Sequence, residues 1–137
     1  MRIDRVATAG TLIGIGALHV IWATGSSFPM SNRSELADTI AGTQDVPGTA
    51  ECLTVAAALG VSGLLVADAV PISAPVRQVA LACAASVLAI RGLAGLTGQT
   101  HRLVPWTPSP TFTAIDRKYY GSLCVALAVG IGAATRK

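Results

Sequence analysis

Apolar residues gather in four long blocks along the chain, at residues 6–23, 50–70, 76–96 and 119–134. Each block is close to the roughly 20 residues that a helix needs to cross the hydrocarbon core of a bilayer. Inside lipid, only helices and closed barrels satisfy their backbone hydrogen bonds, and the blocks lack the in-and-out alternation of barrel strands. The pattern therefore predicts an all-α fold, an integral membrane four-helix antiparallel bundle whose fourth helix runs from about residue 113 to 134.

Composition supports a membrane location for the whole chain. Of its 137 residues, 52% are hydrophobic and only 12% are charged, about half the charged share of a typical soluble domain. Such a chain has too few charged groups to cover a soluble surface. Four spans also leave no room for a second domain, so residues 1–137 are predicted to form a single transmembrane domain.

The first block has a second interpretation, a cleaved signal peptide. Arg2 and Arg5 precede it, and small residues follow it at residues 23–27, which is the layout of a secretory leader. The apolar part is long for such a leader, however. It also carries His19 and Trp22 near its end, which a disposable segment does not need, so a first transmembrane helix is the favoured interpretation.

The basic residues inform topology more than ligand choice. The ten Lys and Arg residues are scattered over loops and ends, which argues against nucleic-acid binding. Five lie on the side of the termini and four on the other side, so the positive-inside rule favours, narrowly, a multi-pass cell-membrane protein with both termini cytoplasmic. The five are Arg2, Arg5, Arg77, Arg136 and Lys137, and the four are Arg33, Arg102, Arg117 and Lys118.

Polar and aromatic residues concentrate at one end of the predicted bundle. The end of the first helix, the start of the second, the end of the third and the start of the fourth meet on one side of the membrane. Nine residues of interest fall there: His19, Trp22, Glu51, Arg91, Trp106, Asp116, Arg117, Tyr119 and Tyr120. The aromatic ones also sit at depths where interfacial anchors occur.

Arg91 is the most costly of these residues, because it lies about 7 to 8 Å inside the end of its helix at 1.5 Å per residue. An arginine at the centre of a span costs about 2.5 to 3.5 kcal/mol, and less toward the interface. We therefore expect it to pair with Glu51 or Asp116. The alternative is that its side chain snorkels to the headgroups.

Local signals give further predictions for the loops and helix starts. Residues 34–41 favour a short interfacial helix stopped by Gly42, with an ordinary polar connection as the alternative. Thr49 is predicted to cap the second helix, with Glu51 in its first turn, where a carboxylate is favoured by the helix dipole. Thr113 and Asp116 have the spacing of a capping box that opens the fourth helix.

Small residues predict which face of the first helix is buried. Gly10 and Gly14, four residues apart, indicate a face that lets another backbone approach closely, and Gly16 lies nearby. The three cysteines, Cys52, Cys83 and Cys124, stand alone in separate spans. That spacing argues against a disulfide framework, a thiol redox centre or a zinc site, and we expect neither a metal nor a cofactor.

Three segments carry a resemblance to a known family. They are Leu18-His19-Val20-Ile21-Trp22-Ala23, Arg91-Gly92, and the run from Asp116 to Cys124, DRKYYGSLC. These resemble a small bacterial integral-membrane family, common in actinobacteria and described only as a domain of unknown function, whose motifs are L-H-x-Y-W-A, R-A-I-G and D-x-R-x-Y-S-P-L-C. Ile21 stands here for the Tyr, and Gly121-Ser122 stands for the Ser-Pro step. The resemblance implies the four-helix membrane fold and no established reaction.

The leading functional hypothesis is an enzyme for a lipophilic, isoprenoid-like substrate. Asp116 or Glu51 would protonate the substrate, and His19 and Arg91 would set the position and protonation of that acid. Aromatic rings would face a developing cation, and Trp106 is a further candidate to bind the substrate. Membrane isomerases and terpene cyclases share this general layout, which is an analogy of layout alone. The aromatic residues in question are Trp22, Tyr119 and Tyr120.

Two alternatives remain beside the enzyme. The first is a non-catalytic membrane protein, a lipophile-binding module or accessory subunit, in which the polar cluster is a structural hydrogen-bond network. The second is a proton-coupled transporter or channel. Four short helices whose opposite halves lack polar residues offer no continuous polar path, so this last hypothesis would require a homo-oligomer.

Overall fold

The computed structural model describes residues 2–136, which contain helices and no strand. Met1 and Lys137, both within the predicted domain, lie outside the described residues. Four segments account for the length of the molecule: α1 (Arg2–Ala23), α3 (Thr49–Val66), α4 (Ala74–Leu96), and a rod made of α5 (Pro110–Ile115), the π-helical turn η2 (Asp116–Tyr120) and α6 (Gly121–Thr135). Two short helices lie in the loops, α2 (Arg33–Ile40) and the 3₁₀ turn η1 (Thr100–Arg102).

Three of these helices are long and apolar enough to cross a membrane: α1 from Ile3 to Ala23, α3 and α4. Large apolar side chains cover the outside of the molecule, with exposed fractions of 65% at Val79, 65% at Val87 and 68% at Val129. Apolar surface on this scale is rare on soluble monomers and marks a membrane or protein interface. The protein is therefore all-α and suited to a membrane.

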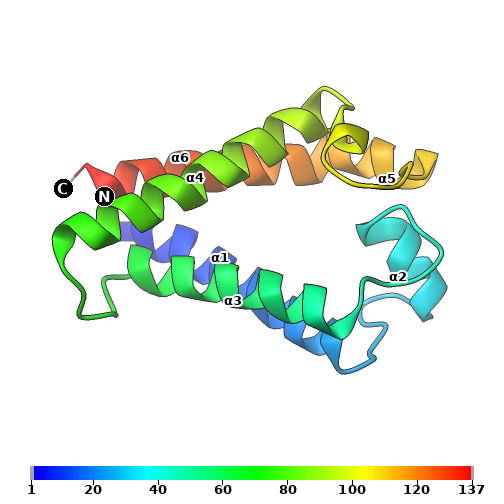
Figure 1. Ribbon diagram of the computed structural model, residues 1–137, viewed down its shortest axis with the longest axis horizontal. Coiled ribbons are helices and arrows are strands. Elements are labelled where there is room, and N and C mark those ends of the chain that lie inside the picture. Colours follow the sequence, from blue (N-terminus) through cyan, green and yellow to red (C-terminus); the bar gives the residue numbers. More distant parts are fainter. Residues whose placement is uncertain (1, 137) are drawn as a thin grey trace.

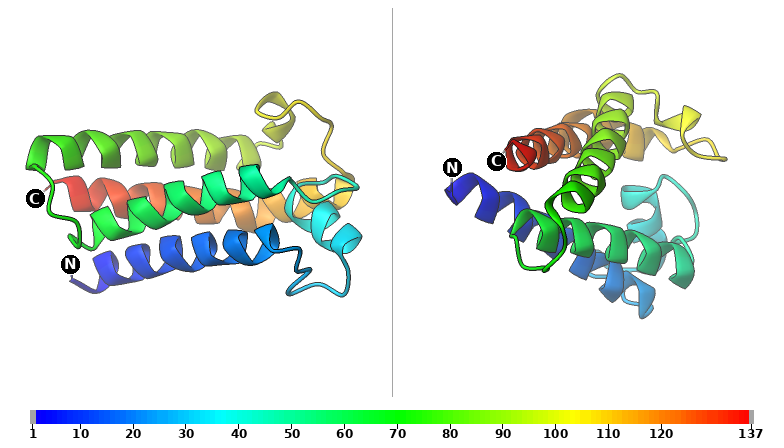
Figure 2. Two further views of the ribbon diagram at one scale, coloured as in Figure 1. Left: turned by 60° about the horizontal axis from the view of Figure 1, so that its bottom comes forward. Right: turned by 60° about the vertical axis from the view of Figure 1, so that its left-hand side comes forward.

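The long helices pack in two pairs, α1 with α3 and α4 with α6 (Figure 1). Within each pair the chain runs in opposite directions, and both termini lie at the same end of the molecule (Figure 2). The pairs meet through a buried apolar core near that end, where Leu12, Val66, Leu81 and Ile131 are at most 1% exposed. At the other end, the loops and α2 lie beside the helix tips.

The buried face of α1 is not the predicted one. Among the described residues, a Cβ added at Gly10 or Gly14 would meet nothing within 4 Å, whereas one at Gly16 would lie 3.1 Å from the carbonyl oxygen of Ala56 in α3. Gly14 is two residues from Gly16, about 200° around the helix, and so lies on the opposite side. The close approach between α1 and α3 is therefore made at Gly16, and the Gly10 prediction is wrong.

The predicted loop helix is confirmed. α2 begins after Asn32, whose Oδ1 accepts from the Glu35 amide at 2.8 Å, while the Glu35 carboxylate accepts from the Ser31 amide at 3.1 Å. This is close to a reciprocal capping box. At its other end Gly42 has φ +69°, a conformation that glycine adopts without strain, and the amide of Thr43 reaches back to the Ala37 carbonyl at 3.3 Å.

Two predicted helix caps are wrong. α3 is capped at Gly48, and Thr49 is its first residue, although Glu51 does lie in the first turn as predicted. The rod begins at Pro110, three residues before the predicted start at residue 113. The Ser109 hydroxyl accepts from the Phe112 amide at 3.2 Å, and Pro110 fits the first helical turn. Thr113 is therefore already inside the helix, which frees Asp116 to turn toward α4.

Candidate functional site

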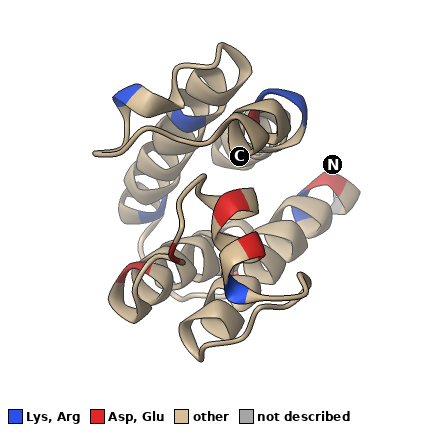
Figure 3. Cartoon of the chain, turned by 90° about the vertical axis from the view of Figure 1, so that its right-hand side faces the viewer, with Lys and Arg blue, Asp and Glu red and all other residues tan. Residues whose placement is uncertain are grey.

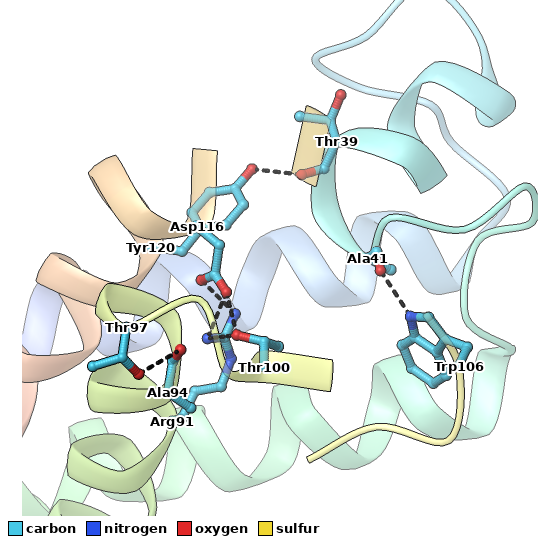
Figure 4. A network of polar contacts seen from close by, with 9 residues as sticks. All are labelled: Thr39, Ala41, Arg91, Ala94, Thr97, Thr100, Trp106, Asp116 and Tyr120. Carbon is cyan, nitrogen blue, oxygen red and sulfur yellow. Dashed lines mark hydrogen bonds and ion pairs between the residues drawn. The ribbon is translucent and has the colours of Figure 1, made fainter. Parts of the chain in front are cut away.

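An ion pair with a buried carboxylate joins α4 to η2, the π-helical turn of the rod (Figure 4). Arg91 Nη2 lies 2.9 Å from Asp116 Oδ1, and Nη1 donates to Oδ2 at 3.2 Å. The Thr100 hydroxyl, from η1, also donates to Oδ2. Asp116 is 1% exposed, while the Arg91 side chain keeps 29% of its surface. The sequence left Glu51 and Asp116 as possible partners of Arg91, and in the structure the partner is Asp116.

The π-helical turn and three glycines allow this contact. In η2, the Gly121 amide bonds to the Asp116 carbonyl, five residues back, so the turn is wider than an α-helical one. A Cβ added at Gly95 would lie 2.7 Å from Asp116 Oδ1, and one added at Gly121 would lie 2.9 Å from the Gly92 carbonyl oxygen. Only glycine fits at these contacts without displacing a neighbour. The two helices therefore approach closely beside the ion pair.

A pocket of about 200 Å³ opens beside Asp116. At roughly 30 Å³ per water molecule in the liquid, this volume corresponds to about seven waters. Sequence reasoning did not identify its other polar walls, because a threonine or histidine in a loop carries no periodic signal. The pocket is lined by Gly98, Thr100, His101, Thr107, Pro108, Thr113 and Asp116.

A second, wider hollow of about 920 Å³ lies on the other side of the segment 107–109, between α2 and the loop that precedes α5. Thr107 borders both spaces. The hollow is open, with Glu35 and Asp38 on the α2 side and Trp106 on the other. We call the 200 Å³ space the inner pocket and this one the outer hollow.

Three aromatic residues that were predicted to line a substrate site donate hydrogen bonds that hold the loops in place. The Trp22 indole donates to the Phe28 carbonyl at 2.7 Å, that of Trp106 donates to Ala41 at 2.9 Å, and the Tyr120 hydroxyl donates to Thr39 at 3.1 Å. Figure 4 shows the last two contacts reaching α2 from separate elements. All three acceptors lie between residues 28 and 41. These bonds hold residues 28–41 over the polar end, and we call this segment the α2 cap.

The other predicted site residues lie away from the ion pair. His19 Nδ1 lies 2.8 Å from the Ile15 carbonyl oxygen of its own helix, and its ring centre lies 4.7 Å from that of Trp22. Glu51 is exposed, with its carboxylate folded over Gly48 at the start of α3. Tyr119 is 58% exposed, and the Lys118 amine lies 5.2 Å from its ring centre. The predicted ring of His19, Glu51, Arg91 and Asp116 thus separates, with only Arg91 and Asp116 together.

The chemistry available at the ion pair follows from its contacts. Asp116 faces two guanidinium nitrogens and accepts from one hydroxyl, which is the bonding of an ionised carboxylate. In this arrangement it is an acceptor and an electrostatic partner. Thr100 and Asp116 nevertheless both border the inner pocket, so a molecule seated there would meet a hydroxyl and a carboxylate oxygen.

Comparison with known proteins identifies the family. No curated protein and no solved structure matches the chain. A family model described as "Protein of unknown function (DUF3995)" matches residues 12–131. The matched region is well over half of the chain and contains the capped polar end with Arg91, Thr100 and Asp116. The chain therefore belongs to the DUF3995 family.

Proposed function

We propose that this protein is a four-span integral membrane protein whose capped polar end binds the polar head of a lipophilic small molecule. Three spans are the apolar helices α1, α3 and α4. The fourth would be the rod α5–η2–α6. Its 26 residues would extend about 39 Å at 1.5 Å each, against a hydrocarbon core of about 30 Å.

The charges of the rod support this fourth crossing. Its only charged residues are Asp116, Arg117 and Lys118. Asp116 is neutralised by Arg91, and the other two are exposed next to the polar end. From Tyr119 onward the rod is uncharged. The four spans would form one antiparallel transmembrane domain with both termini on one side, and the count of five basic residues against four narrowly favours the cytoplasm for that side.

The observation that carries the binding proposal is the inner pocket beside the buried Asp116–Thr100 contact. Small-molecule sites combine a concave space with a few well-placed polar groups, and this one is lined by the carboxylate of Asp116, three threonines and the His101 ring. Asp116 already contacts Arg91 and Thr100, and a ligand seated in the pocket could bind without breaking these contacts. Association of several copies is not needed for the pocket, which one chain completes.

The second candidate is the isomerase or cyclase that the sequence suggested. One observation favours it, since Asp116 borders the inner pocket. A general acid must lie within hydrogen-bond reach of the group it protonates and must carry a proton to give. The separation of His19 and Glu51 from Asp116, together with the guanidinium contacts of Asp116, makes binding the better supported function.

Two histidine variants test the proposal. His101→Ala alters the wall of the inner pocket, whereas His19→Ala removes a ring outside it. We expect farnesol, used as an isoprenoid alcohol probe, to raise the thermal midpoint of the wild type and of His19→Ala in detergent, and to raise that of His101→Ala less. Co-purified small molecules, identified by native mass spectrometry, should likewise be lost from His101→Ala. Equal behaviour of the two variants would contradict a ligand in this pocket.

The same proteins distinguish the enzyme. If Glu51→Gln or His19→Ala folds normally and abolishes turnover of an isoprenoid substrate by the wild type, these residues take part in catalysis and the binding proposal is wrong. We expect both variants to fold and no turnover to depend on them, since neither side chain contacts the pocket.

A further inference from the structure

Charge is divided between the two halves of the polar end. On the half formed by α4, η1 and η2, three cations are exposed, Arg102, Arg117 and Lys118, while the carboxylate of Asp116 is buried against Arg91. The other half, formed by α2 and the start of α3, carries the acidic side chains. These are Glu35, Asp38, Asp45 and Glu51.

Figure 3 looks onto this end and shows the division directly, with blue turns on the upper helices and most of the red on the lower ones. Among the described residues of this acidic half, from α2 to the start of α3, Arg33 is the one cation, and its guanidinium is hydrogen-bonded within the fold. Its Nη1 donates to the carbonyls of Trp22 at 2.9 Å and Ser26 at 2.8 Å. The exposed positive charge of the polar end therefore lies along one edge, and we call Arg102, Arg117 and Lys118 the basic edge.

Exposed apolar side chains adjoin the basic edge. Leu93 and Leu96 lie on the last turns of α4, and Tyr119 and Leu123 lie on the adjoining turns of the rod. Arg117 extends across the end of α4, because a Cβ added at Gly98 would lie 3.5 Å from its Cδ. A molecule bound here would meet cations at one end and an apolar helix surface at the other.

We propose that the basic edge binds the phosphate headgroups of anionic phospholipids, whose acyl chains lie along the exposed surface of α4 and the rod. This inference rests on the proposed membrane function, although not on a ligand in the inner pocket. A free phosphate ion would gain nothing from the apolar surface, whereas a phospholipid matches both parts. The acidic half of the same end would repel such headgroups, so the selection is confined to one side of the molecule.

The test compares lipids retained by the protein. The wild type is reconstituted into vesicles of four parts phosphatidylcholine to one part phosphatidylglycerol. Lipids that remain bound after mild detergent release are identified by native mass spectrometry. We expect phosphatidylglycerol to be enriched several-fold over its share in the vesicles. Removing one cation should lower the enrichment roughly fivefold at most, and Arg102→Gln/Arg117→Gln/Lys118→Gln should return it to the bulk ratio.

A matched variant separates the edge from net charge. Ser31→Asp/Ser34→Asp/Gln44→Glu lowers the net charge by the same amount through exposed residues of the acidic half, and should retain the enrichment. An equal loss of enrichment in both triple variants would overturn the inference. The inference would also be overturned if inorganic phosphate displaced phosphatidylglycerol while chloride at the same ionic strength did not. Flotation with the vesicles reports on insertion. A protein that fails to float overturns the membrane function itself, whereas one that inserts without lipid preference overturns this inference alone.

Discussion

Arg91 and Asp116 depend on each other at the scale of single residues. A lone arginine within a span is unfavourable, and a lone carboxylate that is 1% exposed would be more so. Together, with the Thr100 hydroxyl, they satisfy each other's charge where α4 meets the rod. Such a pair adds little net stability over a well-packed apolar replacement, but removing one partner is costly.

We therefore predict that Asp116→Leu lowers the free energy of unfolding by roughly 3 kcal/mol, the low end for a broken buried pair because Arg91 is partly exposed. The double variant Arg91→Met/Asp116→Leu should recover most of that loss. Denaturant titration in detergent micelles measures both. If Asp116→Leu were as stable as the wild type, the ion pair would not be the contact that relieves the charge of Arg91.

Tyr120 and Tyr119 offer a second comparison of single residues. Tyr120→Phe removes the hydrogen bond to the Thr39 carbonyl, a loss of about 1 kcal/mol, and should loosen α2. Tyr119→Phe changes a ring that faces outward. Hydrogen exchange over residues 33–42 should become about fivefold faster in Tyr120→Phe and stay unchanged in Tyr119→Phe. Equal rates in both variants would mean that the cap is held elsewhere.

At the scale of elements, glycine decides where helices meet. Gly92, Gly95 and Gly121 bring α4 against the rod, whereas Gly10 and Gly14 face outward from α1. The spacing of Gly10 and Gly14 looked like a contact motif, but glycine spacing alone does not say which face a partner occupies. The decisive glycines are those beside the ion pair.

A pair of Gly→Ala changes tests this reading. Gly95→Ala places a methyl group against Asp116 and should cost roughly 1 to 3 kcal/mol of stability, as overpacking does. Gly14→Ala meets no described neighbour and should be neutral or up to about 1 kcal/mol stabilising, because alanine favours a helix. Thermal denaturation in detergent compares them, and a Gly14→Ala protein destabilised as much as Gly95→Ala would refute the assignment of faces.

Much of the element plan was predictable from the sequence, and the site was less so. Hydrophobic blocks predicted the three apolar helices to within a few residues, and the segment 34–41 with its stop at Gly42 predicted α2. The π-helical turn has no sequence signal of its own, so the direction of Asp116 was open between a helix cap and the bundle interior. His19 and Glu51 share the polar end with Arg91, yet they lie on the other helix pair, and helix order alone does not resolve that separation.

At the scale of the whole molecule, two helix pairs share one core near the termini and are tied at the other end by the α2 cap. The hydrogen bonds from Trp106 and Tyr120 to residues 39–41 connect the basic half of the polar end to the acidic half. The binding proposal and the lipid inference both require that this end lie on one side of the bilayer and the termini on the other. A fourth crossing, by the rod α5–η2–α6, is the part of this proposal that the three apolar helices alone do not supply.

Cysteine accessibility tests the fourth crossing most directly. In a protein with Cys52, Cys83 and Cys124 changed to alanine, single cysteines are introduced as Ser73→Cys, Thr107→Cys or Arg136→Cys. An impermeant thiol reagent is then applied to sealed vesicles of one orientation. The account predicts that Ser73→Cys and Arg136→Cys are labelled from the same side and Thr107→Cys from the opposite side. Labelling of Arg136→Cys together with Thr107→Cys would show that the rod does not cross, and would contradict the four-span protein.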